Sequence, residues 1–263
     1  MVNDMHKMPV AIPLEPRRRA IIVGASSGIG AALVRRLAKE GYLLAILARR
    51  KKALDNLSAE INKEAGETRV LAYQHDVTEY DAIPKMFQKI LRDMRGIDIL
   101  VYVSGAQHPV GFSEYDFKKD KEMVSVGLLG AIAWMGQAAM LFEQMQAGQI
   151  VGISSVAGDR GRVGNPAYNT AKAGLNTYLE ALRNRLTRKG VNVLTVKPGF
   201  VDTETFRRNA KASFGVISPE KAADKIYLAM RKKKQVVYVP GWWRWFMMVI
   251  RNVPSFIFRR LSF

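Results

Sequence analysis

The chain has 263 residues, of which 48% are hydrophobic and 24% charged, and this composition excludes an intrinsically disordered protein. It contains no cysteine, which excludes structural disulfides and thiolate metal sites. The formal net charge of +18 favours an anionic partner, such as a phosphorylated small molecule, an acidic membrane surface or nucleic acid.

Short apolar runs alternate with helical patterns, which predicts a doubly wound α/β fold: a seven-stranded parallel sheet with helices on both faces. Strands are expected at 20–23, 42–47, 69–73, 97–103, 149–153, 191–196 and 235–239. Helices are expected at 28–40, 51–65, between the third and fourth strands, and at 120–146, 166–188 and 219–231. These elements form one domain, 18–240, between an N-terminal extension, 1–17, and a C-terminal amphipathic appendage, 241–263.

Prolines and charges interrupt residues 1–19, so the apolar segment of a signal peptide is not expected there. No run approaches the ~20 apolar residues of a spanning helix. We therefore expect a cytoplasmic protein, either free or peripheral on the inner face of a membrane.

A glycine-rich turn joins the first strand to the first helix. It reads Gly24-Ala25-Ser26-Ser27-Gly28-Ile29-Gly30. Glycines at such a turn let the backbone approach a pyrophosphate, which sits at the positive end of the following helix. The turn predicts a dinucleotide site.

Further motifs follow in a fixed order: Ser154-Ser155, then Tyr168-Asn169-Thr170-Ala171-Lys172, then Lys197-Pro198-Gly199. Together with the glycine spacing, they make residues 18–239 resemble the short-chain dehydrogenase/reductase family. The resemblance implies a Rossmann fold and hydride transfer between a nicotinamide cofactor and a carbonyl or alcohol.

The residues after the second strand decide between the two nicotinamide cofactors. An acidic residue there binds a free ribose 2′-hydroxyl, whereas arginine accommodates a 2′-phosphate. Here Arg49 and Arg50 occupy this place. We expect them to bind the 2′-phosphate of NADP(H) with Ser26; the alternative is that both are solvated loop charges.

The resemblance assigns other positions to the cofactor. It places Asp76 and Val77 beside the adenine, and Ser104 and Gly105 along the cofactor, although both asparagines of the family's Asn-Asn-Ala-Gly are missing here. The turn of Pro198, Gly199, Val201 and Thr203 is expected to cover the nicotinamide amide.

Tyr168 and Lys172 are four residues apart on a predicted helix, so they share one face. A neighbouring ammonium favours the phenolate and lowers the pKa of a tyrosine. The resemblance implies that Tyr168 is the general acid/base, that Lys172 binds the nicotinamide ribose and tunes Tyr168, and that Ser155 polarises the carbonyl.

One position departs from the family. Gly127 stands where a fourth catalytic residue, an asparagine, usually organises a water relay to the lysine. Either a water bonded to backbone groups fills the gap, or proton relay is impaired.

Basic side chains surround the expected substrate site: Arg160, Arg162, Arg207, Arg208 and Lys211. They either receive a phosphate on the substrate or are solvated surface charges. The three histidines, His6, His75 and His108, are scattered, so no metal site is expected.

Residues 241–263 combine aromatic side chains with four arginines and no acid. The aromatic residues are Trp242, Trp243, Trp245, Phe246, Phe256, Phe258 and Phe263. A central run of six apolar residues is too short to span a bilayer but suits a lipid–water interface, and Pro254 ends its helix. The basic run 231–234 adds positive charge. The tail is expected either to contact an anionic membrane surface or to pack on a partner subunit.

The sequence of the tail is similar to that of the family branch that reduces polyprenyl-phosphate-linked keto-sugars in cell-envelope arabinan synthesis. The similar residues are Met247-Met248-Val249-Ile250-Arg251, Pro254 and Ile257-Phe258-Arg259. This similarity implies a lipid-like or lipid-linked carbonyl substrate, although Ala48-Arg49-Arg50 departs from that branch. The alternative is a soluble reductase of 3-oxoacyl, steroid or small carbonyl compounds.

A protein of another class, a non-catalytic NADP-binding regulator or nucleic-acid binder, also accounts for the basic charge. No nucleic-acid-binding motif is evident, so no such partner is expected. A homodimer or homotetramer is expected through the apolar faces of helices 120–146 and 166–188.

Overall fold

The computed structural model describes residues 19–209 and 215–261. Seven parallel strands form one sheet in the order β3-β2-β1-β4-β5-β6-β7. Their bounds are β1 Arg19–Val23, β2 Leu43–Ala48, β3 Val70–Gln74, β4 Ile99–Tyr102, β5 Gly148–Ile153, β6 Val191–Pro198 and β7 Val236–Val239. The predicted doubly wound sheet is confirmed.

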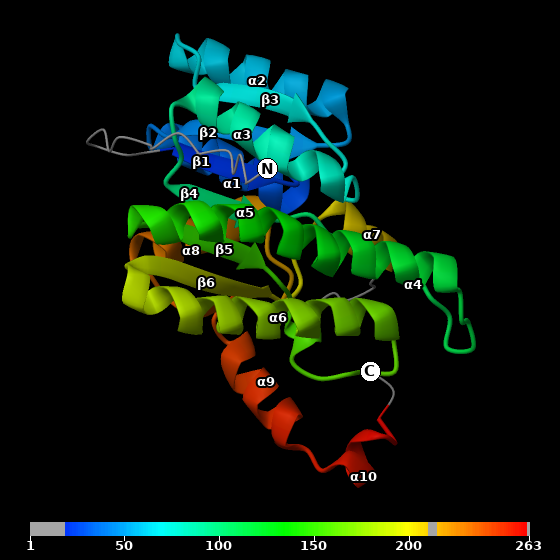
Figure 1. Cartoon of the computed structure of the whole chain (residues 1–263). Coiled ribbons are helices and arrows are strands. Elements are labelled where there is room, and N and C mark those ends of the chain that lie inside the picture. The colour runs from blue at the N-terminus through cyan, green and yellow to red at the C-terminus, as the bar shows by residue number, and fades with distance from the viewer. Residues whose placement is uncertain (1–18, 210–214, 262–263) are drawn as a thin grey trace, which may run out of the picture.

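Helices cover both faces of the sheet (Figure 1). They are α1 Gly28–Lys39, α2 Lys51–Ala65, α3 Ile83–Met94, α4 Phe117–Val124, α5 Gly130–Met145, α6 Pro166–Leu186, α7 Glu204–Asn209 and α8 Pro219–Arg231. Two core clusters result, one on each side of the strands. One contains Leu33 of α1 and Ile226 of α8, and the other contains Trp134 of α5 and Leu179 of α6.

The chain order reverses between β1 and β4, because β2 and β3 lie on one side of β1 and β4 to β7 on the other. In open parallel sheets a ligand site forms at this switch point, beyond the carboxyl ends of the strands. The fold therefore places the loops that follow the strands at this end of the sheet, where a site can form.

The long apolar helix starts earlier than predicted and is not uniform. Asp116 caps α4 by accepting hydrogen bonds from the backbone N–H groups of Lys118 (2.9 Å) and Lys119 (3.3 Å). A π-helical turn, Ser125–Leu129, then joins α4 to α5. Periodicity alone does not reveal such a turn, because it inserts only one extra residue per turn.

The continuous helical run Phe117–Met145 is long and apolar enough to meet the criteria for a membrane span, which the sequence analysis did not anticipate. Trp134, Met135 and Phe142 of this run are fully buried in the core between α5 and the sheet. Packing in the core thus accounts for part of the apolar character of this run.

Two short helices follow β7: α9, Trp243–Asn252, and α10, Ser255–Phe258. The predicted break at Pro254 is confirmed, because Pro254 separates the two helices. They lie beyond the β6–β7 edge of the sheet, on the side away from α2 (Figure 1). Phe263 and the extension 1–17 lie outside the described residues.

Candidate active site

A cavity of about 520 Å³ opens at the carboxyl ends of the strands. Most of the predicted site residues line it: Gly24, Ser26, Ser27, Gly28, Ile29, Arg49, Arg50, Val77, Ser104, Gly105, Ser155, Tyr168, Lys172, Pro198, Gly199, Val201 and Thr203. The predicted cofactor residues Gly30 and Asp76 are not among the lining residues. The fold thus brings segments from six loops to one cavity.

The glycine-rich turn is tightly packed. Gly24 has φ +98°, and a Cβ there would lie 2.5 Å from the backbone nitrogen of Ser104. A Cβ on Gly30 would lie 2.1 Å from the carbonyl oxygen of Gly24, so Gly30 acts by closing the turn and not by lining the cavity. No side chain caps the N-terminus of α1 at Ser27. The first N–H groups of this 12-residue helix are therefore available to an anion.

The two arginines after β2 diverge. Arg50 reaches across the glycine-rich turn and donates hydrogen bonds from its Nη2 to the hydroxyls of Ser26 (3.0 Å) and Ser27 (2.6 Å). Arg49 instead lies 3.9 Å from the carboxylate of Asp76 and 3.8 Å from that of Glu122. Arg50, which also lies 3.5 Å from Glu204, thus forms a cluster with two serine hydroxyls, whereas Arg49 does not; the sequence pattern did not separate the two arginines.

The carboxylate of Asp76 is turned toward its own loop, where it accepts hydrogen bonds from the backbone and hydroxyl of Thr78 (3.0 and 2.9 Å). Burial opposes its ionisation, but these bonds and Arg49 leave its pKa below the ordinary value. His75 lines the cavity in its place, which the sequence analysis missed. It is buried, its ring lies edge-on to Trp134 at 5.4 Å, and burial lowers its pKa, so it is a neutral wall residue.

Ser155, Tyr168 and Lys172 meet at the inner end of the cavity. Ser155 follows β5, and its hydroxyl accepts a hydrogen bond from the N–H of Ala157 (3.1 Å). Lys172 is buried and donates from Nζ to the carbonyl oxygen of Ile153 (3.0 Å), while this Nζ lies 5.9 Å from the Tyr168 ring centroid. The N-cap Asn165 fixes the start of α6, since its side chain accepts from the N–H of Tyr168 (3.3 Å).

The pKa of Tyr168 differs from the expectation. Burial raises it above the ordinary value, although a hydrogen bond with Ser155 and the charge of Arg162 act in the opposite direction. The predicted lowering is thus wrong for the protein alone, because desolvation of the phenolate outweighs the neighbouring charge. Burial also lowers the pKa of Lys172 to about 8.

Arg160 does not face the cavity. Its Nη1 donates to the carbonyl oxygens of Ile250 (2.6 Å) and Val253 (2.5 Å), and its guanidinium lies 3.8 Å over the ring of Phe258. Arg207 pairs with Asp202, and of the two arginines of α7 only Arg208 lines the cavity. Arg160 is therefore a structural anchor of α9–α10 and not a ligand for substrate phosphate. Lys211 lies outside the described residues.

The tail packs on its own domain. Trp243, Met247 and Ile250 of α9 form a buried cluster with Val156, which follows Ser155. The two expectations, a membrane surface or a partner subunit, therefore do not apply to these three side chains. His75 and His108 lie apart, and within 19–209 and 215–261 no group of acidic and histidine side chains is arranged to hold a metal.

A family model described as short chain dehydrogenase matches residues 18–213, most of the chain. The chain belongs to the short-chain dehydrogenase family. An uncharacterized oxidoreductase of Streptomyces coelicolor is 31% identical over 254 residues, which cover 94% of this chain and 96% of that protein. An uncharacterized oxidoreductase of Mycobacterium tuberculosis is 28% identical over 230 residues, covering 87% and 90%. As a member of this family, the protein is an oxidoreductase acting on CH–OH or C=O groups.

Solved structures of the same family agree in fold. A short-chain dehydrogenase from Sphingobium yanoikuyae in complex with NADPH superposes with a TM-score of 0.79 at 26% identity, covering 90% of this chain and 97% of that one. An actinorhodin polyketide ketoreductase variant with NADPH gives 0.77 at 23% identity, covering 88% and 98%, and shares the fold.

The position where the short-chain dehydrogenase pattern has a catalytic asparagine lies in the π-helical turn. A Cβ on Gly127 would lie 3.5 Å from that of Ala171, an ordinary contact, so the glycine is not required by packing there. The buried Tyr102 hydroxyl donates to the carbonyl oxygen of Val126 (2.6 Å) and so fixes the turn from the sheet side. Tyr80 also contacts this turn, because its hydroxyl donates to the carbonyl oxygen of Ser125 (3.2 Å), so two tyrosines hold its backbone.

Proposed function

We propose that the protein is an NADP(H)-dependent reductase that converts a carbonyl to an alcohol by hydride transfer, with Tyr168 as the proton donor. The observation that carries this proposal is a single cavity with two different ends. One end holds Arg50 on two serine hydroxyls and a free helix N-terminus, and the other holds Ser155, Tyr168 and Lys172. Three related or similarly folded proteins solved with NADPH or NADP support the choice of cofactor.

At the anionic end, Arg50 discriminates between the cofactors. Its fork of N–H groups suits a ribose 2′-phosphate, and Ser26 and Ser27 orient it there before any ligand arrives. Arg49 contributes positive potential, although it is 61% exposed and shared with two carboxylates. Arg50 is also exposed (53%) and lies 3.5 Å from Glu204, so its hydrogen bonds to two serine hydroxyls are what set it apart from Arg49.

At the chemical end, NADPH supplies the hydride when it is bound. Ser155 donates a hydrogen bond to the substrate oxygen, and Tyr168 gives its phenolic proton to the developing alkoxide. The raised pKa of Tyr168 keeps that proton in place at neutral pH. Lys172, held by the Ile153 carbonyl, would bind the nicotinamide ribose hydroxyls when the cofactor is present. In the reverse direction, the same tyrosine accepts the proton of the alcohol.

The Tyr168→Phe variant tests this function, because it removes one hydroxyl and keeps the ring. We expect turnover with NADPH and a ketone panel to fall ~100- to 10,000-fold, while NADPH still binds with an affinity close to that of the parent. Full turnover by Tyr168→Phe would refute the assignment. Failure of NADPH to bind even the parent protein would refute the cofactor instead.

We further propose a lipid-like or lipid-linked substrate. The support is the contact between the apolar tail and both loops of the chemical end: Val156 follows Ser155, and Phe200 follows Gly199. The rival is a soluble 3-oxoacyl, steroid or small carbonyl compound. A ketone panel matched in the reacting group but differing in chain length separates them, because turnover of short soluble ketones at equal kcat/KM would favour the rival.

We also propose a homo-oligomer through the outward faces of α5 and α6. Leu129, in the π-helical turn just before α5, is 44% exposed, and Met140, in the second half of α5, is 47% exposed. Large exposed apolar side chains on a helix face indicate a contact surface. Light scattering coupled to gel filtration gives the mass in solution, and a monomer at micromolar concentration would refute this proposal.

A further inference from the structure

Helix α9 is apolar on two opposite sides, but its own domain covers only one. Trp243, Met247 and Ile250 face the domain and are buried. On the other side Trp245 is 63% exposed and Val249 62%. Phe256 of α10 extends this apolar patch and is 61% exposed. We call the exposed side chains of residues 242–261 the tail surface. A soluble helix normally presents polar side chains on its outer side, so the tail surface needs an apolar partner.

The charge of the tail surface limits the kinds of partner that can bind it. Arg244, Arg251, Arg259 and Arg260 are all exposed, and residues 241–263 contain no acidic residue. Over the described residues, none of these four arginines forms an ion pair with an aspartate or glutamate. A partner that is apolar beneath and anionic at its surface satisfies both kinds of side chain. We propose that the tail surface docks on an anionic lipid membrane.

A second copy of the chain fits the same surface poorly. A symmetric contact places each patch against itself, so the four arginines of one tail would meet those of the other. Like charges brought together without counter-charges oppose association. Indole rings and arginines at the edge of an apolar patch are, in contrast, the side chains that favour the lipid–water interface.

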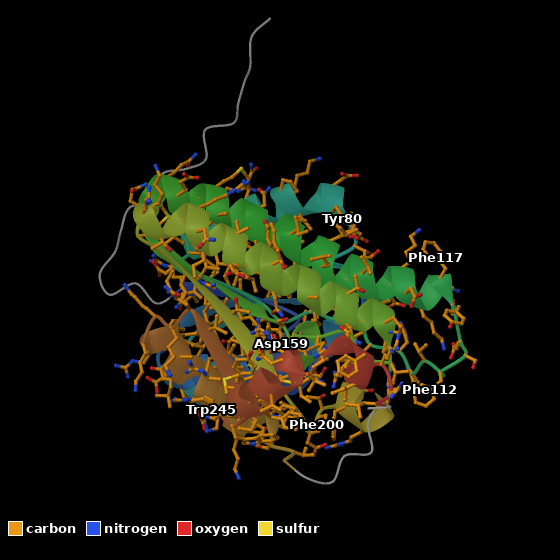
Figure 2. All side chains as sticks on the ribbon, turned by 90° about the horizontal axis from the view of Figure 1, so that it is seen from below. Tyr80, Phe112, Phe117, Asp159, Phe200 and Trp245 are labelled. Carbon is orange, nitrogen blue, oxygen red and sulfur yellow. The ribbon has the colours of Figure 1, made fainter. Side chains whose placement is uncertain are left out.

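The tail surface is held rigidly. Arg160 binds the carbonyl oxygens at the end of α9, and Trp243 packs edge-on against Phe200 at 5.2 Å. Asp159, next to Arg160, binds Lys197 of β6 (2.5 Å) and Tyr238 of β7 (2.6 Å). Seen from below, α9 and α10 lie in front of the domain, and Trp245, Asp159 and Phe200 are labelled around them (Figure 2). The tail is therefore a preformed platform and needs no folding on binding.

Its position relates the membrane to the active site. The tail follows the carboxyl end of β7, and the cavity opens at the carboxyl ends of the strands. The lysines of 232–234 precede the amino end of β7, so they lie at the end of the sheet opposite to the cavity. Phe112 and Phe117, also exposed, are labelled on the opposite side of the view from Trp245 (Figure 2). Docking thus brings the cavity edge toward the lipid, which would give access to a membrane-borne substrate; this last step alone rests on the proposed function.

The test is co-sedimentation of the full chain with phosphatidylcholine vesicles that contain either no anionic lipid or about a third phosphatidylglycerol. We expect binding to the anionic vesicles only, weakened by salt, with a blue shift of tryptophan fluorescence. Arg259→Gln combined with Arg260→Gln should lower the partition coefficient by ~10-fold or more. The matched control, Lys232→Gln with Lys234→Gln, removes the same charge from the opposite end of the sheet. It should lower the partition coefficient less than ~3-fold, because salt screens charges that lie far from the membrane.

A second pair of variants tests the apolar part. Val249→Glu introduces a charge on the tail surface, and Leu228→Glu introduces the same charge on α8, where Leu228 is 51% exposed. Only Val249→Glu should abolish the fluorescence shift, with the melting temperature of both variants near that of the parent. Equal loss in both charge-reduced variants, or equal binding to neutral vesicles, would overturn the proposal. So would a dimer that Val249→Glu dissociates, with no vesicle binding by the parent. Because no readout uses turnover, the result is independent of the proposed activity.

Discussion

The indole nitrogen of Trp243 lies where a side chain on Gly199 would have to stand: a Cβ at this glycine would be 1.9 Å from it. Gly199 belongs to the turn after β6 that lines the cavity, and Trp243 is the first residue of α9. The tail and the active-site turn are therefore packed as one unit. Glycine is required at 199 by this close approach and not by its backbone angles, because its φ is outside the left-handed region.

Gly199→Ala should therefore destabilise the protein by about 1–3 kcal/mol, since the new methyl displaces a buried indole. Urea unfolding measures the change. Gly136→Ala on α5 is the control: nothing lies within 4 Å of its Cβ, so alanine should be neutral or stabilise the helix by up to ~1 kcal/mol. If Gly199→Ala unfolds with the free energy of the parent, the packing of Trp243 on this turn is not as described.

The divergence of Arg49 and Arg50 leads to a second prediction. Arg50→Gln removes the guanidinium that Ser26 and Ser27 orient, and it should weaken NADPH binding roughly 10- to 100-fold, the value of a charged hydrogen bond. Arg49→Gln should weaken it less than Arg50→Gln. NADH binding should change little in either variant, because NADH has no 2′-phosphate. Titration calorimetry with both cofactors checks this, and the opposite ranking of the two arginines would contradict it.

Much of the fold and site follows from the sequence, because apolar periodicity and glycine turns are local signals. The glycines at 24 and 28 and the pair Tyr168–Lys172 depend on short spacings, and the structure brings them to one cavity. What the sequence did not reveal depends on contacts distant along the chain. Arg160 faces α9, 90 residues away, although its neighbours suggested a substrate phosphate. The helix α7 and the π-helical turn are likewise short segments with no periodic signal of their own.

Lys172 connects stability to pH. Burial lowers its pKa from 10.5 to about 8, so the folded state releases the proton more readily than the unfolded one. Below pH 8 the buried ammonium costs the folded state stability, and the cost disappears as pH rises from about 8 to about 10.5. The shift corresponds to roughly 3 kcal/mol at most. Lys172→Met should lose turnover yet unfold at pH 7 with about 1–2 kcal/mol more free energy, since it also forgoes the bond to Ile153.

The measurement for Lys172 is urea unfolding at pH 7 and pH 10. The difference in unfolding free energy between Lys172→Met and the parent should shrink at pH 10, where the parent lysine is neutral. Lys225→Met, at an exposed position on α8, is the control and should show no such convergence. A variant less stable than the parent at pH 7 would mean that the ammonium stabilises the fold.

Arg162 gives the last prediction, which concerns the acid itself. Burial raises the pKa of Tyr168 while the Arg162 charge lowers it, so removing that charge in Arg162→Gln should raise it further. Reduction requires the protonated phenol, and its rate falls as pH rises through this pKa. The alkaline limb of the rate profile for NADPH-dependent reduction should therefore move to higher pH in Arg162→Gln, while oxidation of the alcohol, which requires the phenolate, should become slower near neutral pH. Arg188→Gln, exposed beyond the end of α6, should leave both profiles unchanged. A limb that moves to lower pH, or that does not move while turnover persists, would show that the charge of Arg162 does not act on Tyr168 during catalysis.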